Sequence, residues 1–314
     1  MQNEITITGG NTKMLFTITG TPITVLQDNL LLQKKISLAV LRLDTIHPVV
    51  SGNKLFKLHY FLEAAAASAH KTIITFGGAY SNHLAATAFA CKTAGIKSIG
   101  IVRGEQPTTL SHTLQQCLAD GMQLDFISRE QYAEKEHPGF LQQLKNNWGD
   151  GIIVPEGGYG NTGTAGAALI WQCIPQNSYT HICTAAGTAT TLAGILQGSA
   201  GETVIGIPVL KGMTDIPARI AFCCGNNDKK EQLQVFDGYH FGGYAKKTPG
   251  LLAFMNTFWQ QHQIPTDFVY TAKLFYAVFD KIKNDHFKPG SKILCLHTGG
   301  LQGNFSLQKG SLLF

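Results

Sequence analysis

Short apolar runs alternate with longer helical patterns along most of the chain. Each run is rich in β-branched residues and is followed by a stretch with helical spacing. Apolar strands of this length, separated by helices, are typical of parallel sheets that are buried on both faces. The pattern predicts an α/β fold with strands at residues 72–78, 97–104, 123–128, 151–158, 180–187, 203–210 and 292–300, and helices at 81–95 and 109–121.

Several of the predicted strands end in Gly-Gly or Gly-Thr. The segments are "FGG" at 76–78, "EGG" at 156–158, "AAGTATT" at 185–191 and "HTGG" at 297–300. In open parallel sheets, ligands bind beyond the carboxyl ends of the strands, where loops and helix N-termini meet. Four such ends in one chain favour a ligand-binding crevice over glycines that only make turns.

The composition suits a globular enzyme of two modest domains. The chain has 314 residues, 44% of them hydrophobic and 14% charged, and a net charge of +5. No long basic run is present, so we expect no nucleic-acid partner. The seven cysteines lack metal-ligand spacing, so we expect reduced, buried thiols and no metal. Neither a signal peptide nor a membrane-spanning run is recognisable, so we expect a cytoplasmic protein with no membrane partner.

The segment "AAGTATTLAG" at 185–194 predicts an anion site. A glycine followed by small hydroxyl residues opens a helix directly after a strand, which presents backbone N–H groups and the helix dipole to an anion. The segment matches neither GxGxxG nor GxxxxGK[ST], so a single phosphate fits better than a dinucleotide or a nucleoside triphosphate. The same residues also suit an ordinary strand–helix turn.

Two lysines open the helical pattern before the first glycine-rich strand end. In "SGNKLFKLHY", Lys54 and Lys57 lie one helical turn apart. First-turn lysines are usually exposed, but a lysine together with a phosphate site is what pyridoxal phosphate requires, because this cofactor forms a Schiff base with a lysine. We expect the charge of Lys57 to lower the pKa of Lys54, which favours the free amine.

The motifs, taken in chain order, resemble those of one enzyme family. They are "SGNKLFKLHY", "TFGGAYSNH", "AAGTATTLAG", "FGGYAKK", "VYTAK" and "HTGG". Together they resemble the D-cysteine desulfhydrase and 1-aminocyclopropane-1-carboxylate (ACC) deaminase family, from about Arg42 to about Asn304. The resemblance implies pyridoxal 5'-phosphate as cofactor and the tryptophan synthase β-subunit fold, a two-domain open twisted parallel-sheet fold with helices on both sheet faces.

The resemblance also implies a domain division and an assembly. We expect a large cofactor-binding domain of residues 1–46 and 154–314 and a small domain of residues 47–153. We expect a homodimer that acts on a small amino-acid substrate.

Individual residues take expected roles from the same resemblance. Lys54 corresponds to the family's Schiff-base lysine, and Ser81, Tyr244 and Tyr270 are the other expected catalytic residues, with Ser81 facing the substrate. Asn82 is expected to hydrogen-bond the ring hydroxyl of the cofactor. The remaining expected cofactor-binding residues are Lys57, the phosphate loop of Gly187, Thr188, Ala189, Thr190 and Thr191, and the pair Thr271 and Thr298, which would flank the pyridine nitrogen.

The expected reaction depends on that threonine pair. ACC deaminases of the family carry glutamate in "VYE" and leucine in "HLGG", where this chain has Thr271 and Thr298. A neutral hydroxyl does not hold a protonated pyridine as a carboxylate does. We therefore expect β-elimination from a D-amino acid, namely conversion of D-cysteine to pyruvate, hydrogen sulfide and ammonia. Deamination of ACC to 2-oxobutanoate and ammonia is the alternative.

Other assignments stay open at this point. Both reactions belong to amino-acid metabolism, and we expect the reaction classes lyase and hydrolase. A racemase or dehydratase acting on serine-like substrates, and a cofactor-bound protein without activity, are further alternatives. His83, inside "YSNH", is either a proton relay or a packed, hydrogen-bonded residue.

Overall fold

A computed structural model describes residues 23–47, 50, 52–225 and 228–314, and it describes only short strands within the first 22 residues. These strands form two antiparallel pairs, β1 with β4 and β2 with β3. Their bounds are Glu4–Ile5 for β1, Thr8–Gly9 for β2, Thr12–Lys13 for β3 and Ile18–Thr19 for β4. Much of the first part of the expected large domain, and Ser51 of the "SGNK" motif, therefore lie outside the described residues.

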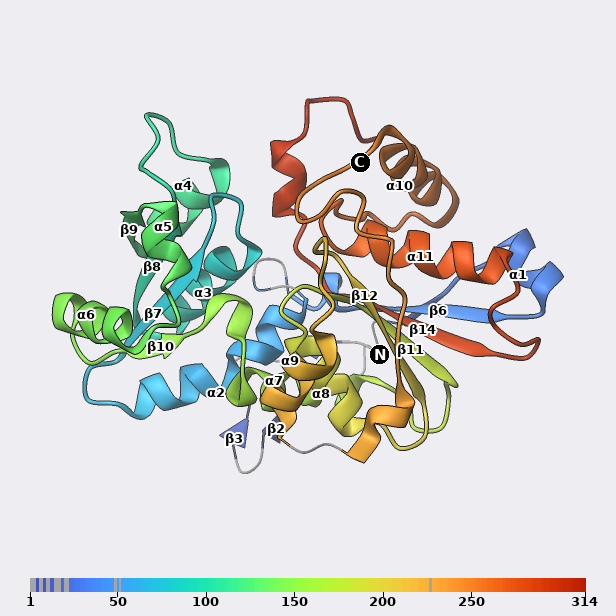
Figure 1. Cartoon of the computed structure of the whole chain (residues 1–314), viewed down its shortest axis with the longest axis horizontal. Coiled ribbons are helices and arrows are strands. Elements are labelled where there is room, and N and C mark those ends of the chain that lie inside the picture. The colour runs from blue at the N-terminus through green and yellow to red at the C-terminus, as the bar shows by residue number, and fades with distance from the viewer. Residues whose placement is uncertain are drawn as a thin grey trace.

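Two sheets form the centres of two lobes (Figure 1). The smaller sheet is parallel, with the strand order β10-β7-β8-β9, and the larger sheet has the order β13-β12-β11-β14-β6-β5. In the larger sheet only β5 runs antiparallel to its neighbour. The bounds are Ile23–Val25 (β5), Ser37–Arg42 (β6), Thr72–Gly77 (β7), Lys97–Arg103 (β8), Gln123–Ile127 (β9), Ile152–Val154 (β10), His181–Ala186 (β11), Thr203–Pro208 (β12), Leu233–Val235 (β13) and Lys292–His297 (β14).

Helices cover both faces of the sheets, and two helices connect the lobes. Helices α2 and α7 pack against each other, α2 also contacts α3 of the smaller lobe, and α7 also contacts α8 of the larger lobe. The α-helices are Asn29–Lys34 (α1), Asn53–Ala67 (α2), Asn82–Ala94 (α3), His112–Ala119 (α4), Arg129–Ala133 (α5), Pro138–Trp148 (α6), Asn161–Ala168 (α7), Thr190–Gly198 (α8), Ile216–Cys224 (α9), Pro249–His262 (α10) and Thr271–Lys283 (α11). Short 3-10 helices span Leu43–Thr45, Glu156–Gly158, Leu169–Cys173, Asp228–Gln232 and Gln302–Ser306.

The expected α/β fold is confirmed, and all seven predicted strands are present. Every residue of β7 is buried, as a strand covered on both faces requires. The predicted strands are too long at their carboxyl ends, where the chain leaves the sheet and, at Glu156–Gly158, forms a 3-10 helix. Strands β5, β6 and β13 were not predicted. The run that forms β6 is short and apolar, so its periodicity does not distinguish a strand from a turn of buried helix.

The domain boundaries remain a prediction. The smaller sheet contains strands from residue 72 onward, but Val154, which we assigned to the large domain, pairs with Thr75 of that sheet. All seven cysteines are free thiols, as expected, and six of them are buried. None of the described helices is long and apolar enough to cross a bilayer.

Candidate active site

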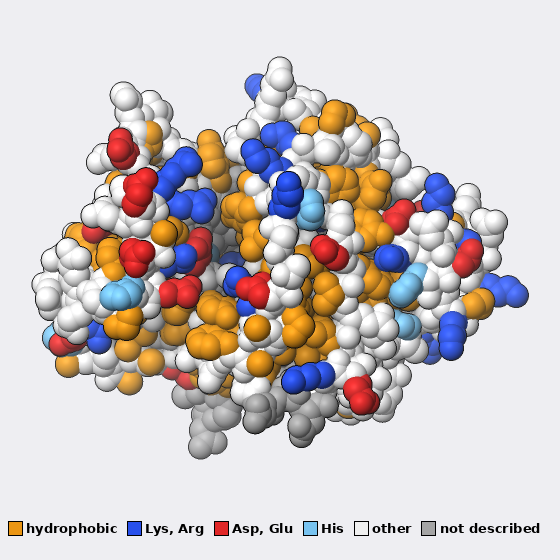
Figure 2. Space-filling model, in the orientation of Figure 1, with side chains coloured by type: hydrophobic (Ala, Val, Ile, Leu, Met, Phe, Trp, Pro, Cys, Tyr) orange, Lys and Arg blue, Asp and Glu red, His pale blue; other side chains and the backbone are white. Residues whose placement is uncertain are grey.

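A cavity of about 380 Å³ lies where the carboxyl ends of strands from both sheets converge. Its walls include the residues that follow β7, β10 and β11 and the carboxyl ends of β8 and β14. This is the ligand position expected for open parallel sheets. Figure 2 shows a hollow between the two lobes, with Lys and Arg side chains on both sides of it.

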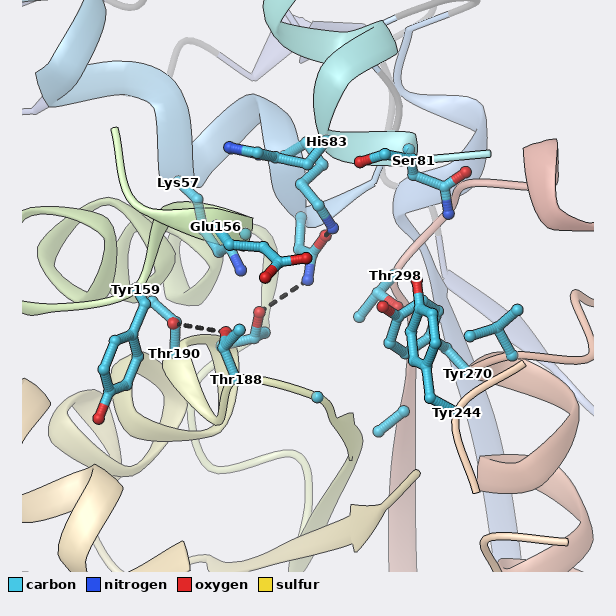
Figure 3. Close-up of a pocket in the computed structure, with 18 of the residues that line it drawn as sticks. Lys57, Ser81, His83, Glu156, Tyr159, Thr188, Thr190, Tyr244, Tyr270 and Thr298 are labelled. Carbon is cyan, nitrogen blue, oxygen red and sulfur yellow. Dashed lines mark hydrogen bonds between the residues drawn. The ribbon is translucent and has the colours of Figure 1, made fainter. Parts of the chain in front are cut away.

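All of the expected site residues except Thr271 line this cavity. Figure 3 shows Lys57, Thr188 and Thr190 on one side and Thr298, Tyr244 and Tyr270 on the other. The complete set is Lys54, Lys57, Ser81, Asn82, Gly187, Thr188, Ala189, Thr190, Thr191, Tyr244, Tyr270 and Thr298. The structure thus brings the motifs together, and the role of each residue stays a prediction.

Lys54 lies in the first turn of α2, close to the end of β14. Gly52 has φ +72°, and a Cβ atom there would lie 1.8 Å from the carbonyl oxygen of Thr298, so only glycine lets α2 begin at this point. The Nζ atom of Lys54 donates to Asn53 Oδ1 at 2.8 Å, and Asn53 Nδ2 donates to Thr191 Oγ1 at 2.7 Å. Asn53, which the sequence analysis missed, therefore connects Lys54 to the expected phosphate loop.

Burial lowers the pKa of both lysines. The pKa of Lys54 falls from 10.5 to about 8 because the amine is desolvated, and the carboxylate of Asp267 acts against this shift. The pKa of Lys57 lies well below its ordinary value, first because of desolvation and second because of the charge of Lys54. The lowered pKa of Lys54 is confirmed. Desolvation is the largest cause at Lys54, whereas the repulsion between the two lysines lowers the pKa of Lys57.

Asp267 is a buried carboxylate that the sequence analysis missed. Its oxygens accept the backbone N–H groups of Val269 and Tyr270 at 2.8 Å and of Thr271 at 2.9 Å. Burial raises the pKa of this carboxyl group, and the hydrogen bonds from Thr271 and Tyr270 oppose the rise. An aspartate shortly before a helical run is a capping signal, and here it accepts the N–H groups of two residues that lead into α11 and of Thr271, the first residue of the helix.

Thr271 does not line the cavity. The residue is fully buried, and its hydroxyl donates to Asp267 Oδ1 at 2.8 Å. Thr298, the other member of the expected pair, does lie on the cavity wall. Of the expected pair, Thr298 therefore lines the cavity and Thr271 does not, and the role of Thr298 beside the cofactor stays a prediction.

The loop between β11 and α8 has the features of an anion site. Ala189 precedes α8 with φ 64°, and no side chain caps the helix, so its first N–H groups are open to a ligand. The hydroxyls of Thr188 and Thr190 are hydrogen-bonded at 2.8 Å. A Cβ atom on Gly157 would lie 3.2 Å from the methyl group of Thr188 and 3.9 Å from Lys57 Nζ, which places this amine next to the loop.

The loop after β7 presents a hydroxyl and an amide. The hydroxyl of Ser81 accepts the N–H of Leu84 at 3.2 Å and so caps α3. The Nδ2 atom of Asn82 donates to the carbonyl oxygen of Gly300 at 2.9 Å. The buried Oδ1 atom of Asn82 has no hydrogen-bond partner among the described residues. Asn82 thus offers an acceptor to whatever occupies the cavity.

His83 is buried between the lysines and the smaller sheet. Its Nε2 atom lies 2.9 Å from the hydroxyl of Thr75. Burial, and then the charges of Lys54 and Lys57, hold its pKa well below the ordinary value. His83 is therefore a neutral imidazole with a hydrogen-bonding partner in the protein.

Two tyrosines form the opposite wall of the cavity. The rings of Tyr244 and Tyr270 meet edge to face, with centroids 6.1 Å apart. Burial raises the pKa of both hydroxyls, so both are neutral near pH 7. These hydroxyls can donate or accept a hydrogen bond without adding charge.

The cavity as a whole fits pyridoxal phosphate. It combines a lysine amine of lowered pKa, an uncapped helix N-terminus beside two hydroxyls, and the unpartnered oxygen of Asn82. The cofactor needs a lysine, a phosphate site and a partner for its ring hydroxyl. Each of these three needs has a residue of the matching chemistry in this cavity.

Comparison with known proteins identifies relatives of the chain. Residues 14–299 match the family described as pyridoxal-phosphate dependent enzymes. The mitochondrial bifunctional D-cysteine desulfhydrase/ACC deaminase of Arabidopsis thaliana is 28% identical over 289 residues, covering 81% of this chain and 70% of the relative. The D-cysteine desulfhydrase of Klebsiella pneumoniae is 24% identical over 283 residues, covering 84% and 86%. A crystal structure described as an ACC deaminase homologue aligns with a TM-score of 0.75, 27% identity and 90% coverage of both chains.

These relatives correct one expectation. We expected the reaction classes lyase and hydrolase. The desulfhydrase and deaminase activities named for the relatives are lyase reactions, so the class hydrolase is wrong.

Proposed function

Since the chain belongs to the family of pyridoxal-phosphate dependent enzymes, and within it to the group of D-cysteine desulfhydrases and ACC deaminases, we propose that it is a lyase that catalyses β-elimination from a D-amino acid. D-cysteine is the proposed substrate, and pyruvate, hydrogen sulfide and ammonia are the products. When bound, the cofactor supplies an electron sink for the negative charge that develops at the substrate Cα. The residues around the cavity would bind and orient the substrate and move protons.

Lys54 is the proposed residue for covalent attachment of the cofactor and for proton transfer at Cα. With a pKa of about 8, its Nζ atom has a substantial neutral fraction near pH 7.5, and a neutral amine can attack a carbonyl group or accept a proton. The hydrogen bond to Asn53 Oδ1 orients this amine. Burial and the charge of Lys54 disfavour a positive charge on Lys57, and a phosphate bound beside this amine would favour the charge.

The other walls would bind the remaining groups. The loop of residues 187–191 would hold the phosphate, and the Oδ1 atom of Asn82 would accept a hydrogen bond from the ring hydroxyl. Ser81, at the N-terminus of α3, is the proposed contact of the substrate carboxylate. Tyr244 and Tyr270 would exclude water from the face of the cavity opposite Lys57.

The neutral lining around Thr298 is the observation that favours elimination. The hydroxyl of Thr298 lies with Tyr244 and Tyr270 on one side of the cavity (Figure 3). Among the described residues, the carboxylates that line the cavity are Glu136 and Glu156. Glu156 lies on the opposite side, with Lys57 and Thr188 (Figure 3).

Glu136, the second of these carboxylates, affects the pKa of Tyr159, a residue that lies on the side of Thr188 (Figure 3). A neutral hydroxyl beside the pyridine nitrogen gives a moderate electron sink. Such a sink is adequate for expelling a thiolate and poor for opening a cyclopropane ring.

Product analysis tests this proposal. Purified protein, reconstituted with pyridoxal phosphate, should release equal amounts of pyruvate, sulfide and ammonia from D-cysteine. L-cysteine is the matched control for chirality and should react much more slowly. Release of 2-oxobutanoate from ACC at the higher rate would replace the proposal by ACC deamination.

We also propose the domain division after residues 46 and 153, a homodimer and a cytoplasmic location. The two sheets, which separate near these positions along the chain, support the division. Light scattering after size exclusion should give twice the chain mass of 34.0 kDa. A mass of one chain at micromolar concentration would contradict the dimer.

A further inference from the structure

Arg103 is an arginine of the cavity wall that the proposed reaction does not use. It ends β8 in the smaller lobe, and its side chain is exposed and lines the cavity. A Cβ atom on Gly78 would lie 3.5 Å from Arg103 Nη2, so the guanidinium group lies against the loop that carries Ser81. The side chain therefore reaches the part of the cavity where the substrate is proposed to bind.

The charge of Arg103 is not neutralised within the described part of the chain. No carboxylate there forms an ion pair with it. By contrast, Lys135 pairs with Glu156 at 3.6 Å and Arg219 pairs with Asp215 at 2.9 Å. The Cζ atom of Arg103 lies 5.7 Å from the centre of the Tyr132 ring, a contact that orients the guanidinium group and leaves its charge in place.

The described cavity lining as a whole carries an excess of positive charge, which also favours an anionic ligand. This lining contains five Lys or Arg residues and two Glu residues. The phosphate of the cofactor would be matched by Lys57 and the loop at 187–191, and Lys54 would be consumed by covalent attachment. The positive charge of Arg103 also lowers the pKa of Tyr244, on the opposite wall of the cavity, although the larger effect of burial raises it. Arg103 thus leaves a positive charge facing the space between the two walls.

We propose that Arg103 binds an anionic group on the β-substituent of the substrate. The inference rests on the proposed β-elimination and adds to D-cysteine a second substrate class, D-amino acids whose β leaving group carries a negative charge, such as a sulfate ester. Guanidinium binds such oxyanions through paired hydrogen bonds. The α-carboxylate has its own proposed site at Ser81, so the group that Arg103 binds is a second anion, on the β-substituent.

The reaction balances without a further reactant. Displaced from the cofactor by the substrate amine, Lys54 Nζ would accept the Cα proton, and the Cβ–O bond would break with its electron pair on the departing sulfate. The released aminoacrylate takes up a proton, and water hydrolyses it to pyruvate and ammonia. Because the sulfate gains charge as the bond breaks, Arg103 would bind the transition state more tightly than the ground state.

Two substrates that differ in the charge of the β-substituent test the inference. They are O-sulfo-D-serine and β-chloro-D-alanine, and the readout is the ratio of their kcat/KM values on the reconstituted enzyme. In Arg103→Gln this ratio should fall about 10- to 100-fold, because a charge-assisted hydrogen bond is lost. Arg103→Lys should keep part of the preference. Arg129→Gln, the matched control at an exposed arginine that does not line the cavity, should leave the ratio at the wild-type value.

A binding readout complements the rates. Inorganic sulfate, at constant ionic strength, should inhibit turnover of β-chloro-D-alanine competitively, and Arg103→Gln should raise its inhibition constant about tenfold or more. An equal loss of kcat/KM for both substrates would assign Arg103 to the α-carboxylate or to structure. No change in either kcat/KM value would show that Arg103 binds no anion. Either result would overturn this inference and leave the proposed function standing. Absence of pyruvate from both substrates in the wild-type enzyme would overturn the proposed function, and the inference with it.

Discussion

Lys54 and Lys57 differ in what surrounds their amines. The carboxylate of Asp267 supports the charge of Lys54, and the pKa of Lys54 falls only to about 8. At Lys57, desolvation and then the charge of Lys54 hold the pKa well below its ordinary value. The two lysines, one turn apart on α2, are thus expected to differ in their chemistry. The amine of Lys54 exchanges protons near neutral pH, whereas the charge of Lys57 depends on a bound anion.

The pH dependence of cofactor attachment should report the pKa of Lys54. The neutral amine is the nucleophile, so in protein stripped of cofactor the rate of covalent attachment should rise with pH, with a midpoint of about 8. Asp267→Asn removes the carboxylate that raises this pKa, so it should move the midpoint to lower pH. Stopped-flow absorbance measures both. A midpoint near the ordinary value of 10.5 would mean that burial does not control this amine.

Borohydride reduction should assign the attachment site. Peptide mass spectrometry after reduction should find the cofactor on Lys54 and none in Lys54→Ala. Lys57→Ala should keep the attachment on Lys54 and bind the cofactor about tenfold more weakly, because the phosphate loses a charged neighbour. Recovery of the cofactor on Lys57 in the wild-type protein would reverse the proposed roles.

The site residues that could be predicted are those inside local motifs. Lys54, Asn82 and the loop at 187–191 stand beside glycines or helix starts that the sequence displays. Asn53 and Asp267 were missed because their importance depends on partners in the folded chain. Asn53 matters through its hydrogen bond to Thr191, far along the sequence, and Asp267 through its burial near Lys54.

At the scale of elements, the start of α11 depends on one carboxylate. Asp267 accepts three backbone N–H groups and the hydroxyl of Thr271. Asp267→Ala leaves these donors buried without an acceptor and should lower the free energy of unfolding by about 2 kcal/mol. Urea unfolding measures the loss. Asp267→Asn keeps one oxygen acceptor and should lose less.

A surface carboxylate provides the control for that change. Asp285 is exposed and pairs with Lys34 at 2.6 Å, and Asp285→Ala should change the unfolding midpoint little. Equal losses at Asp267 and Asp285 would contradict the capping role.

The proposed phosphate site depends on the start of α8. Thr188→Val keeps the shape of the side chain and removes a hydroxyl from the proposed phosphate loop, so cofactor affinity should fall about 10- to 100-fold. Thr93→Val, an exposed threonine whose hydroxyl donates to Phe89 in α3, is the matched control and should leave the affinity unchanged. Titration at limiting cofactor measures both. Full affinity in Thr188→Val would place the phosphate elsewhere.

Elements differ in how well the sequence predicts them. Strands such as β7 are recognisable because both faces are buried and the run TIITFG is rich in apolar and β-branched residues. Strand β6, next to the edge strand β5, is also apolar, but no glycine-rich end marks it, and its place between β14 and β5 is set by pairing with distant residues. Long-range pairing of this kind is not encoded in local periodicity.

At the scale of the whole molecule, the two lobes meet at one cavity lined by the carboxyl ends of both sheets. The smaller lobe contributes Ser81, Asn82 and Arg103, and the larger lobe contributes the loop at 187–191 and Thr298. The sequence predicts this convergence through its four glycine-rich strand ends. The proposed reaction choice depends on the lining, which contains no described carboxylate on the side of Thr298; the buried Asp267 acts on Tyr244 and Tyr270 without lining the cavity.

A competition between the two candidate substrates tests the central claim most directly. The reconstituted enzyme is given D-cysteine and ACC together at equal concentration, and the 2-oxo acids formed are separated and counted. Pyruvate from D-cysteine and 2-oxobutanoate from ACC then report the ratio of the two kcat/KM values in one vessel. Because Thr298 presents a neutral hydroxyl, we expect pyruvate to exceed 2-oxobutanoate by at least about tenfold. An excess of 2-oxobutanoate would contradict the proposed β-elimination and establish ring opening as the reaction of this site.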